Sequence, residues 1–148
     1  MSDKPIIMAS AEETGQISRT LLDWLNDYPE LPVDRINFEF LGESGGMSLS
    51  TIQGAYKTAQ YITGGYTAEY QFKLIYRVIG ENNNARLGAD ETLDKIADWA
   101  AGRKDKPDIG EGRTVTKIVI NSLSSLFARY EDSGEDHQIL MTLIYEVN

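Results

Sequence analysis

The strongest constraint on the fold is a run of alternating residues that follows Thr63-Gly64-Gly65. Polar residues occupy most odd positions of this run, although Ile75 and Ile79 are apolar exceptions. The even positions carry aromatic or apolar residues: Tyr66, Ala68, Tyr70, Phe72, Leu74, Tyr76 and Val78. A period of two is typical of a β-strand with one buried face. Because the glycines favour a turn, residues 47–79 are predicted to form a long hairpin.

A second long hairpin is predicted for residues 115–147, with its turn at 132–135. Its return arm alternates through Ile139, Met141, Leu143, Tyr145 and Val147. Leu140 and Ile144 make the other face of this arm apolar too. Such a strand is expected at the centre of a sheet, or at an edge that another subunit covers.

One further strand and two helices are predicted. Residues 35–41 alternate, with Ile36, Phe38 and Phe40 expected on a buried face. Ser10 and Glu13 match a capping box before a helix at 11–27, and Pro29 follows its end. Asparagines at 82–84 precede a second helix at 84–101. The helical stripes are Ile17, Leu21, Trp24, Leu25 and Tyr28 in the first helix, and Leu93, Ile96, Ala97 and Ala100 in the second.

These elements predict an α+β fold in the order α-β-β-β-α-β-β. Neighbouring hairpin strands are antiparallel, so we expect a mostly antiparallel sheet of about five strands with both helices packed on one face. A length of 148 residues fits a single domain, 1–148. Residues 1–10 are expected to form a flexible N-terminal arm.

Composition narrows the function. The formal charge of −9 argues against a broad nucleic-acid-binding surface, which needs clustered Lys and Arg. The absence of cysteine excludes disulfides and thiolate chemistry. No apolar run approaches the roughly 20 residues of a transmembrane helix, and no secretion signal is visible, so no membrane association is expected.

Little in the sequence suggests chemistry. His137 is the only histidine, and we expect it to be exposed in an acidic turn. Four acids within 131–136 are interpreted as a solvated hairpin tip, with weak calcium binding as the alternative. The loop 42–46 is interpreted as a flexible surface loop and not a phosphate cradle, since it leads into a strand and holds an acid. We therefore expect no catalytic, cofactor-binding or metal-binding residues, although paired carboxylates leave an enzyme as an alternative.

Loops on a rigid scaffold are where binding concentrates, and three of them are candidate protein-contact sites. The eight tyrosines fit this interpretation, since tyrosine is favoured at interfaces as well as in cores. The candidate residues are Gly45, Gly46 and Met47 in the first loop, Gly64, Gly65 and Tyr66 at the hairpin tip, and Asp132, Glu135 and Asp136 in the acidic turn.

Several stretches in this order resemble one known family. They are Leu21-Leu22-Asp23-Trp24-Leu25-Asn26, Tyr61-Ile62-Thr63-Gly64-Gly65-Tyr66, Tyr70-Gln71-Phe72-Lys73-Leu74-Ile75-Tyr76-Arg77 and Tyr130-Glu131-Asp132-Ser133-Gly134-Glu135-Asp136. Over residues 14–146 the chain resembles minor capsid or tail proteins of temperate siphophages of Gram-positive bacteria. The element order is similar to that of tail-terminator proteins.

The resemblance implies a structural virion protein and no catalytic residues. Such a subunit would form a six-fold homo-oligomeric ring at the head-proximal end of the tail, after assembly in the host cytoplasm. Its partners would be the major tail-tube protein and a head-completion or connector protein, and DNA would pass through without specific binding. The alternatives are another head–tail completion or tail-tube subunit, or a non-phage α+β protein-binding module.

Overall fold

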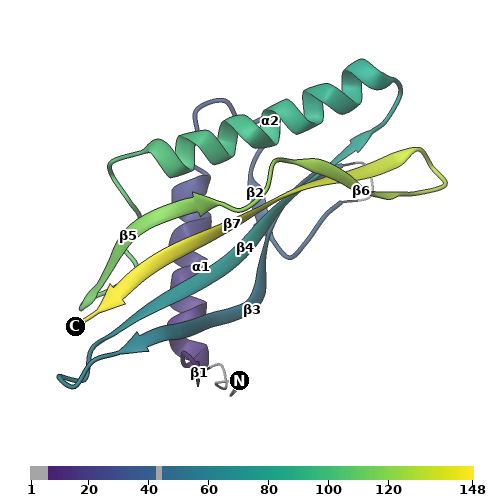
Figure 1. Ribbon diagram of the computed structural model, residues 1–148. Coiled ribbons are helices and arrows are strands. Elements are labelled where there is room, and N and C mark those ends of the chain that lie inside the picture. Colours follow the sequence, from purple (N-terminus) through teal and green to yellow (C-terminus); the bar gives the residue numbers. More distant parts are fainter. Residues whose placement is uncertain (1–6, 43–44) are drawn as a thin grey trace.

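The computed structural model describes residues 7–42 and 45–148, which form an α+β fold. Two helices and one large, mostly antiparallel sheet make up this part of the chain, which confirms the predicted class (Figure 1). The elements are β1 Ile7–Met8, α1 Ala11–Leu25, β2 Ile36–Phe38, β3 Gly46–Gln60, β4 Tyr66–Ile79, α2 Asn83–Gly102, β5 Arg113–Ile120, β6 Ser125–Arg129 and β7 Gly134–Val147.

The sheet is built around the antiparallel pair β4 and β7. These strands stay in register along their whole length, from Tyr66 opposite Val147 to Ile79 opposite Gly134. The strand order is β1-β3-β4-β7-β5, with β2 on β3 and β6 on β7. β2 pairs with β3 in parallel, and the other strand pairs are antiparallel. The central place of β7 accounts for its two apolar faces.

The described residues hold seven strands, where about five were predicted. One addition is β1, in which Ile7 pairs with Lys57 and Met8 with Tyr56. These residues belong to the expected N-terminal arm, of which 1–6 lie outside the described residues. The other addition arises because the first arm of the second hairpin divides into β5 and β6.

The break between β5 and β6 is held by α2. The Ser124 amide donates to Asp94 Oδ1 at 3.0 Å, and the Ser124 hydroxyl donates to the Asp90 carbonyl at 2.8 Å. These bonds draw residues 121–124 toward the helix, so the strand is interrupted there. Both resulting strands still pair with β7.

Helix α1 begins as predicted, and its end positions β2. Ser10 Oγ accepts the Glu13 amide at 3.1 Å, which caps the helix. At the other end, the Asn26 amide group accepts from the Ile36 nitrogen and donates to the Ile36 carbonyl. This contact seats Ile36 in the core, where it is fully buried.

The strand predicted for 35–41 is confirmed over Ile36–Phe38, but its length and the burial of Phe38 and Phe40 were predicted wrongly. Phe38 and Phe40 are exposed, and the strand ends at Phe38. The backbone at Glu39, whose φ of 49° lies in the left-handed region, ends the regular pairing with β3, and the Phe40 amide donates to the Ser48 hydroxyl instead.

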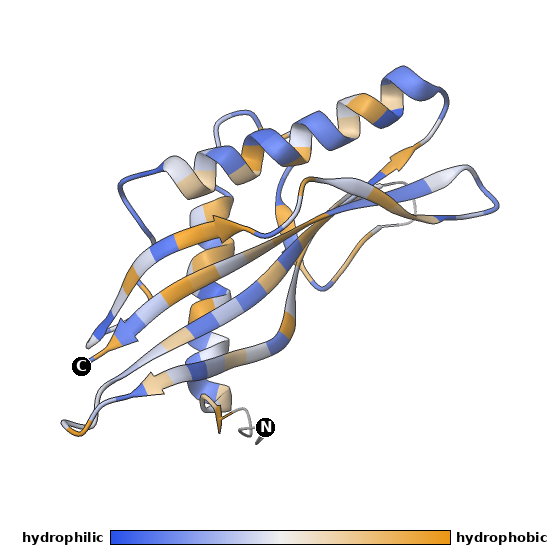
Figure 2. Cartoon of the chain, viewed as in Figure 1, coloured by the Kyte–Doolittle hydropathy of each residue, from blue (hydrophilic) through white to orange (hydrophobic). Residues whose placement is uncertain are grey.

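The core lies on one face of the sheet, and both helices pack there. Tyr70 of β4 bonds Ser18 of α1, Tyr145 of β7 bonds Glu13 of α1, and His137 of β7 bonds Asp90 of α2. Along the central strands, hydrophilic and hydrophobic residues alternate (Figure 2). The predicted stripes of both helices are buried, apart from the partly buried Tyr28.

The opposite face of the sheet carries no helix. Its side chains make polar cross-strand contacts, such as the Tyr56 hydroxyl donating to Glu69 Oε2 and the Thr142 hydroxyl donating to Asn121 Oδ1. Lys73 lies over the Phe127 ring at 5.7 Å on this side. Within the described residues, no helix is long and apolar enough to span a membrane.

Candidate functional site

The first candidate loop is only partly at the surface. Gly45 and Gly46 line an open hollow of about 750 Å³ beside residues 33–35 and 76–79. Met47 is fully buried, so its side chain is not available for contact. Gly45 has a φ of 126°, and a Cβ there would lie 3.1 Å from the Arg77 carbonyl oxygen, so glycine suits this position. Residues 43 and 44 of this loop lie outside the described residues.

At the hairpin tip, Gly64 is exposed, whereas Gly65 is buried and Tyr66 half-buried. A Cβ on Gly65 would lie 2.6 Å from the Val147 carbonyl oxygen, so this glycine allows the end of β7 to approach. The exposed apolar surface belongs instead to Tyr61 and Ile62, and Ile62 is fully exposed. The sequence signal for them was an apolar pair immediately before a glycine turn.

The prediction of a solvated acidic tip is wrong for two of its residues. Asp132 is exposed and accepts the Gly134 amide at 3.0 Å, as a turn residue does. Glu135 and Asp136 are each only 2% exposed. The turn ends before them, because β7 begins at Gly134 and both acids enter the sheet.

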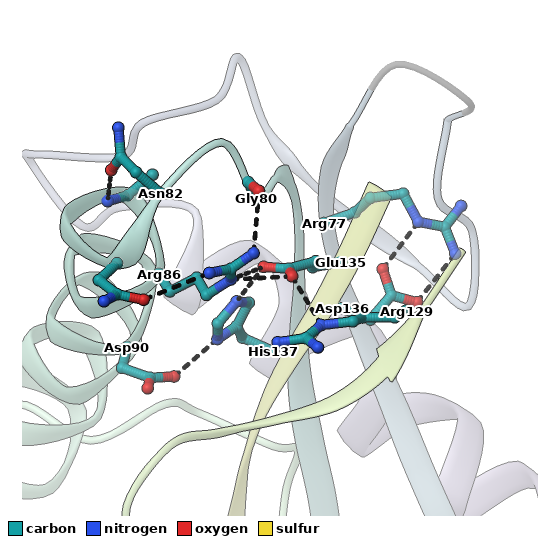
Figure 3. Close-up of polar contacts among 11 residues, drawn as sticks. Arg77, Gly80, Asn82, Arg86, Asp90, Arg129, Glu135, Asp136 and His137 are labelled. Carbon is teal, nitrogen blue, oxygen red and sulfur yellow. Dashed lines mark hydrogen bonds and ion pairs between the residues drawn. The ribbon is translucent and has the colours of Figure 1, made fainter. Parts of the chain in front are cut away.

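Glu135 is neutralised by arginines from two other elements (Figure 3). Arg86 Nε of α2 donates to both carboxylate oxygens, at 3.1 and 3.0 Å, and Arg129 Nε of β6 donates to Oε2 at 2.9 Å. Burial by itself raises the pKa of Glu135, but these hydrogen bonds outweigh it and hold the pKa below its usual value. The carboxylate therefore joins α2, β6 and β7.

Asp136 points to the helix-free face and makes a separate ion pair. Arg77 of β4 donates through Nε to Oδ1 at 2.7 Å and through Nη2 to Oδ2 at 2.9 Å, a bidentate arrangement. The Tyr130 hydroxyl donates to Oδ2 at 2.7 Å. Burial opposes ionisation, yet these donors lower the pKa of Asp136, and the same contact raises the pKa of Arg77.

The expectation that His137 is exposed is also wrong, because it is 1% exposed. Its Nδ1 lies 2.8 Å from Asp90 Oδ1, and its Nε2 lies 3.8 Å from Glu135 Oε1 (Figure 3). The signal that was missed is register: 135, 137 and 139 share one face of β7 with the core residues. His137 thus lies on the face that α2 covers.

Sequence reasoning also missed the role of the Glu13 side chain. Its carboxylate accepts hydroxyl donors from Tyr66 of β4 and Tyr145 of β7, and Arg113 Nη2 lies 3.7 Å away. Burial, together with the Glu13 carboxylate, raises the pKa of the Tyr66 hydroxyl to about 12. The same two causes raise the pKa of the Tyr145 hydroxyl. Capping-box spacing predicted that Glu13 would serve the helix terminus, but its side chain ties α1 to the centre of the sheet.

The contacts of Glu13, Glu135 and Asp136 are ion pairs and hydrogen bonds that join one element to another. Each buried carboxylate already accepts two or more donors from other parts of the chain. Over residues 7–42 and 45–148, no group of three His, Cys, Asp or Glu side chains is placed to hold a metal ion.

The fold and these contacts define a small α+β protein whose buried charges are paired internally. Its exposed large apolar side chains include Tyr61 and Ile62 at a hairpin tip, Phe38 and Phe40 at the end of β2, and Leu87 on α2. A comparison with protein-family models finds no match, and a comparison with curated proteins finds none either.

Proposed function

We propose that this chain is a structural virion protein, a tail terminator that caps a phage tail tube and joins it to the head connector. The observation that carries the proposal is the placement of its exposed large apolar side chains. Tyr61 and Ile62 form the tip of the β3–β4 hairpin, Phe38 ends β2 with Phe40 just beyond it, and Leu123 lies between β5 and β6. Adjacent apolar groups on a surface, such as Tyr61 and Ile62, are typical of sites that bind other proteins.

The internal ion pairs support an assembly role. Arg86, Arg129 and Glu135 join three elements, and Arg77 with Asp136 joins the two central strands. A sheet fastened in this way holds its tips and loops in fixed positions, as a subunit of a repeating assembly requires.

The resemblance of residues 14–146 to siphophage minor capsid and tail proteins supports the phage part of the proposal. In this role about six copies form a ring at the head-proximal end of the tail. The major tail-tube protein binds one side and a head-completion protein the other, while DNA passes through the lumen. The subunit is made in the host cytoplasm and ends in the virion.

Size-exclusion chromatography with light scattering, followed by negative-stain microscopy, tests the proposal. The expected result is a discrete oligomer near six subunits at high protein concentration, with a central opening. A particle that stays a monomer or dimer favours the alternative, a non-phage protein-binding module. Stacked rings or tubes favour a tail-tube subunit instead, and genes for head-joining and tube proteins on either side favour the terminator.

A further inference from the structure

An apolar groove lies between α1 and the outer edge of β3. Its volume is about 620 Å³. Apolar lining comes from Met8, Leu22 and Phe38, and Gly54 of β3 also lines it. The groove is also lined by Arg19 and Glu39, which carry opposite charges.

The groove exists because two short strands leave a gap along β3. β1 covers Tyr56 and Lys57, and β2 covers residues 47–49. Between them β3 has an irregular register after Ile52, where Gln53 and Gly54 have φ of 53° and 76°. The left-handed turn at Glu39 carries the chain away from the same place, so nothing in the described residues fills the gap.

The β3–β4 tip displays an apolar side chain on a rigid turn. The Tyr61 amide donates to the Gly65 carbonyl at 2.8 Å, and the Gly64 amide donates to the Tyr61 carbonyl at 3.0 Å. The Tyr61 hydroxyl bonds the Thr67 hydroxyl at 2.6 Å, which fixes the ring. Ile62 is therefore presented fully exposed on a preformed turn, so little conformational freedom is lost when it binds.

The charge distribution makes the tip and the groove of two copies compatible surfaces. Two copies of a chain with a charge of −9 repel each other, so they are expected to meet where acids are absent. Residues 44–68, which include the tip and the β3 side of the groove, hold a single charged residue, Lys57. Glu39 is the one acid in the groove lining, and Arg19 offsets its charge.

We propose that the Tyr61–Ile62 tip of one copy inserts into the α1–β3 groove of a second copy. The inference rests on the self-assembly in the proposed function, but not on a place in a phage tail. Tip and groove occupy different parts of the molecule, so each copy offers one of each. Such a head-to-tail contact closes into a ring or continues as a filament.

Disulfide trapping tests this contact directly, because the chain has no cysteine of its own. A tagged Ile62→Cys chain is mixed with an untagged Met8→Cys or Phe38→Cys chain under mild oxidation. The expected product is the mixed disulfide, in at least tenfold excess over linkage to a matched Leu123→Cys chain. Leu123 is 77% exposed and lies outside the groove. Equal linkage to Leu123→Cys, or none to either groove position, overturns the proposal.

Sedimentation of Ile62→Asp and Ile62→Val chains gives a second measurement. Ile62 is fully exposed, so neither change disturbs the monomer. Ile62→Asp is expected to weaken self-association at least tenfold, and Ile62→Val to leave it within about twofold. An Ile62→Asp chain that forms the wild-type oligomer overturns the tip contact and leaves the ring itself standing. A mixed groove disulfide in a chain that forms only filaments supports the contact and contradicts the terminator function.

Discussion

At the scale of single residues, three buried carboxylates connect elements that are distant in the sequence. Glu13 joins α1 to the sheet, Glu135 joins β7 to α2 and β6, and Asp136 joins β7 to β4. A buried charge is costly unless it is paired and hydrogen-bonded. Each therefore depends on partners that the fold brings into place.

Replacing Glu135 with Gln is expected to destabilise the protein by about 2 kcal/mol at neutral pH, because Arg86 and Arg129 lose their shared anion. The folded-state pKa of Glu135 is lowered, so its contribution is present above the unfolded pKa and is lost as pH falls through the folded pKa. Wild-type stability should therefore fall as the pH drops below the ordinary glutamate pKa of about 4.5, and the Glu135→Gln variant should lose less stability over the same acid range.

Urea denaturation at several pH values measures this effect. Glu131→Gln is the matched control, because Glu131 is an exposed neighbour in the same turn. Its stability should stay within about 0.5 kcal/mol of wild type. Equal pH dependence in wild type and Glu135→Gln would contradict the assigned role of the ion pair.

At the scale of elements, replacing each of two glycines with alanine is expected to change the stability in opposite directions. A Cβ on Gly88, inside α2, meets nothing within 4 Å, so Gly88→Ala should stabilise the protein by up to about 1 kcal/mol. A Cβ on Gly65 would lie 2.6 Å from the backbone of Val147, so Gly65→Ala should destabilise by about 2 kcal/mol. Thermal unfolding of the two variants checks both signs, and a neutral Gly65→Ala would refute the close approach of β7.

Local periodicity was sufficient to predict both helices, the first hairpin and the long strand β7. Those features depend on neighbours a few residues away, such as the stripe through Leu93 and Ala97 or the alternation from Tyr66. The break at 121–124 was not predictable, since its anchors Asp90 and Asp94 lie about thirty residues earlier in α2. Burial of the second hairpin's acids was missed largely for the same reason. Arg86 of α2 is 49 residues from Glu135 and Arg77 of β4 is 59 residues from Asp136, and only Arg129 of β6 is a near neighbour.

At the scale of the whole molecule, neither margin of the sheet offers a long regular edge for strand addition. The β3 margin is covered in part by β1 and β2 and is irregular between Ile52 and Ala55. The β5 margin has a bulge between Val115 and Lys117, and the lysine is exposed. Bulges and edge lysines are common means of preventing strand addition. Side-chain surfaces are therefore better suited than sheet extension to join copies.

The proposed passage of DNA through a ring makes a prediction about the acidic turn. Its exposed acids are Glu131 and Asp132, since Glu135 and Asp136 are buried; neutralising all four would damage the fold. The double variant Glu131→Gln with Asp132→Asn removes two negative charges, and the amide oxygen of Asn keeps an acceptor for the Gly134 amide. If the turn faces the DNA path, this variant should retain DNA in a low-salt gel-shift assay where wild type does not, because repulsion of phosphate is reduced.

The matched control removes the same charge from a different surface. Glu91 and Asp98 are exposed on α2, so Glu91→Gln with Asp98→Asn changes the net charge equally. A general effect of net charge would raise DNA retention alike in both double variants, whereas a turn that faces the DNA path raises it mainly in the first. Equal retention in both variants would assign the effect to net charge alone. Retention in neither variant would contradict a turn that faces the DNA path.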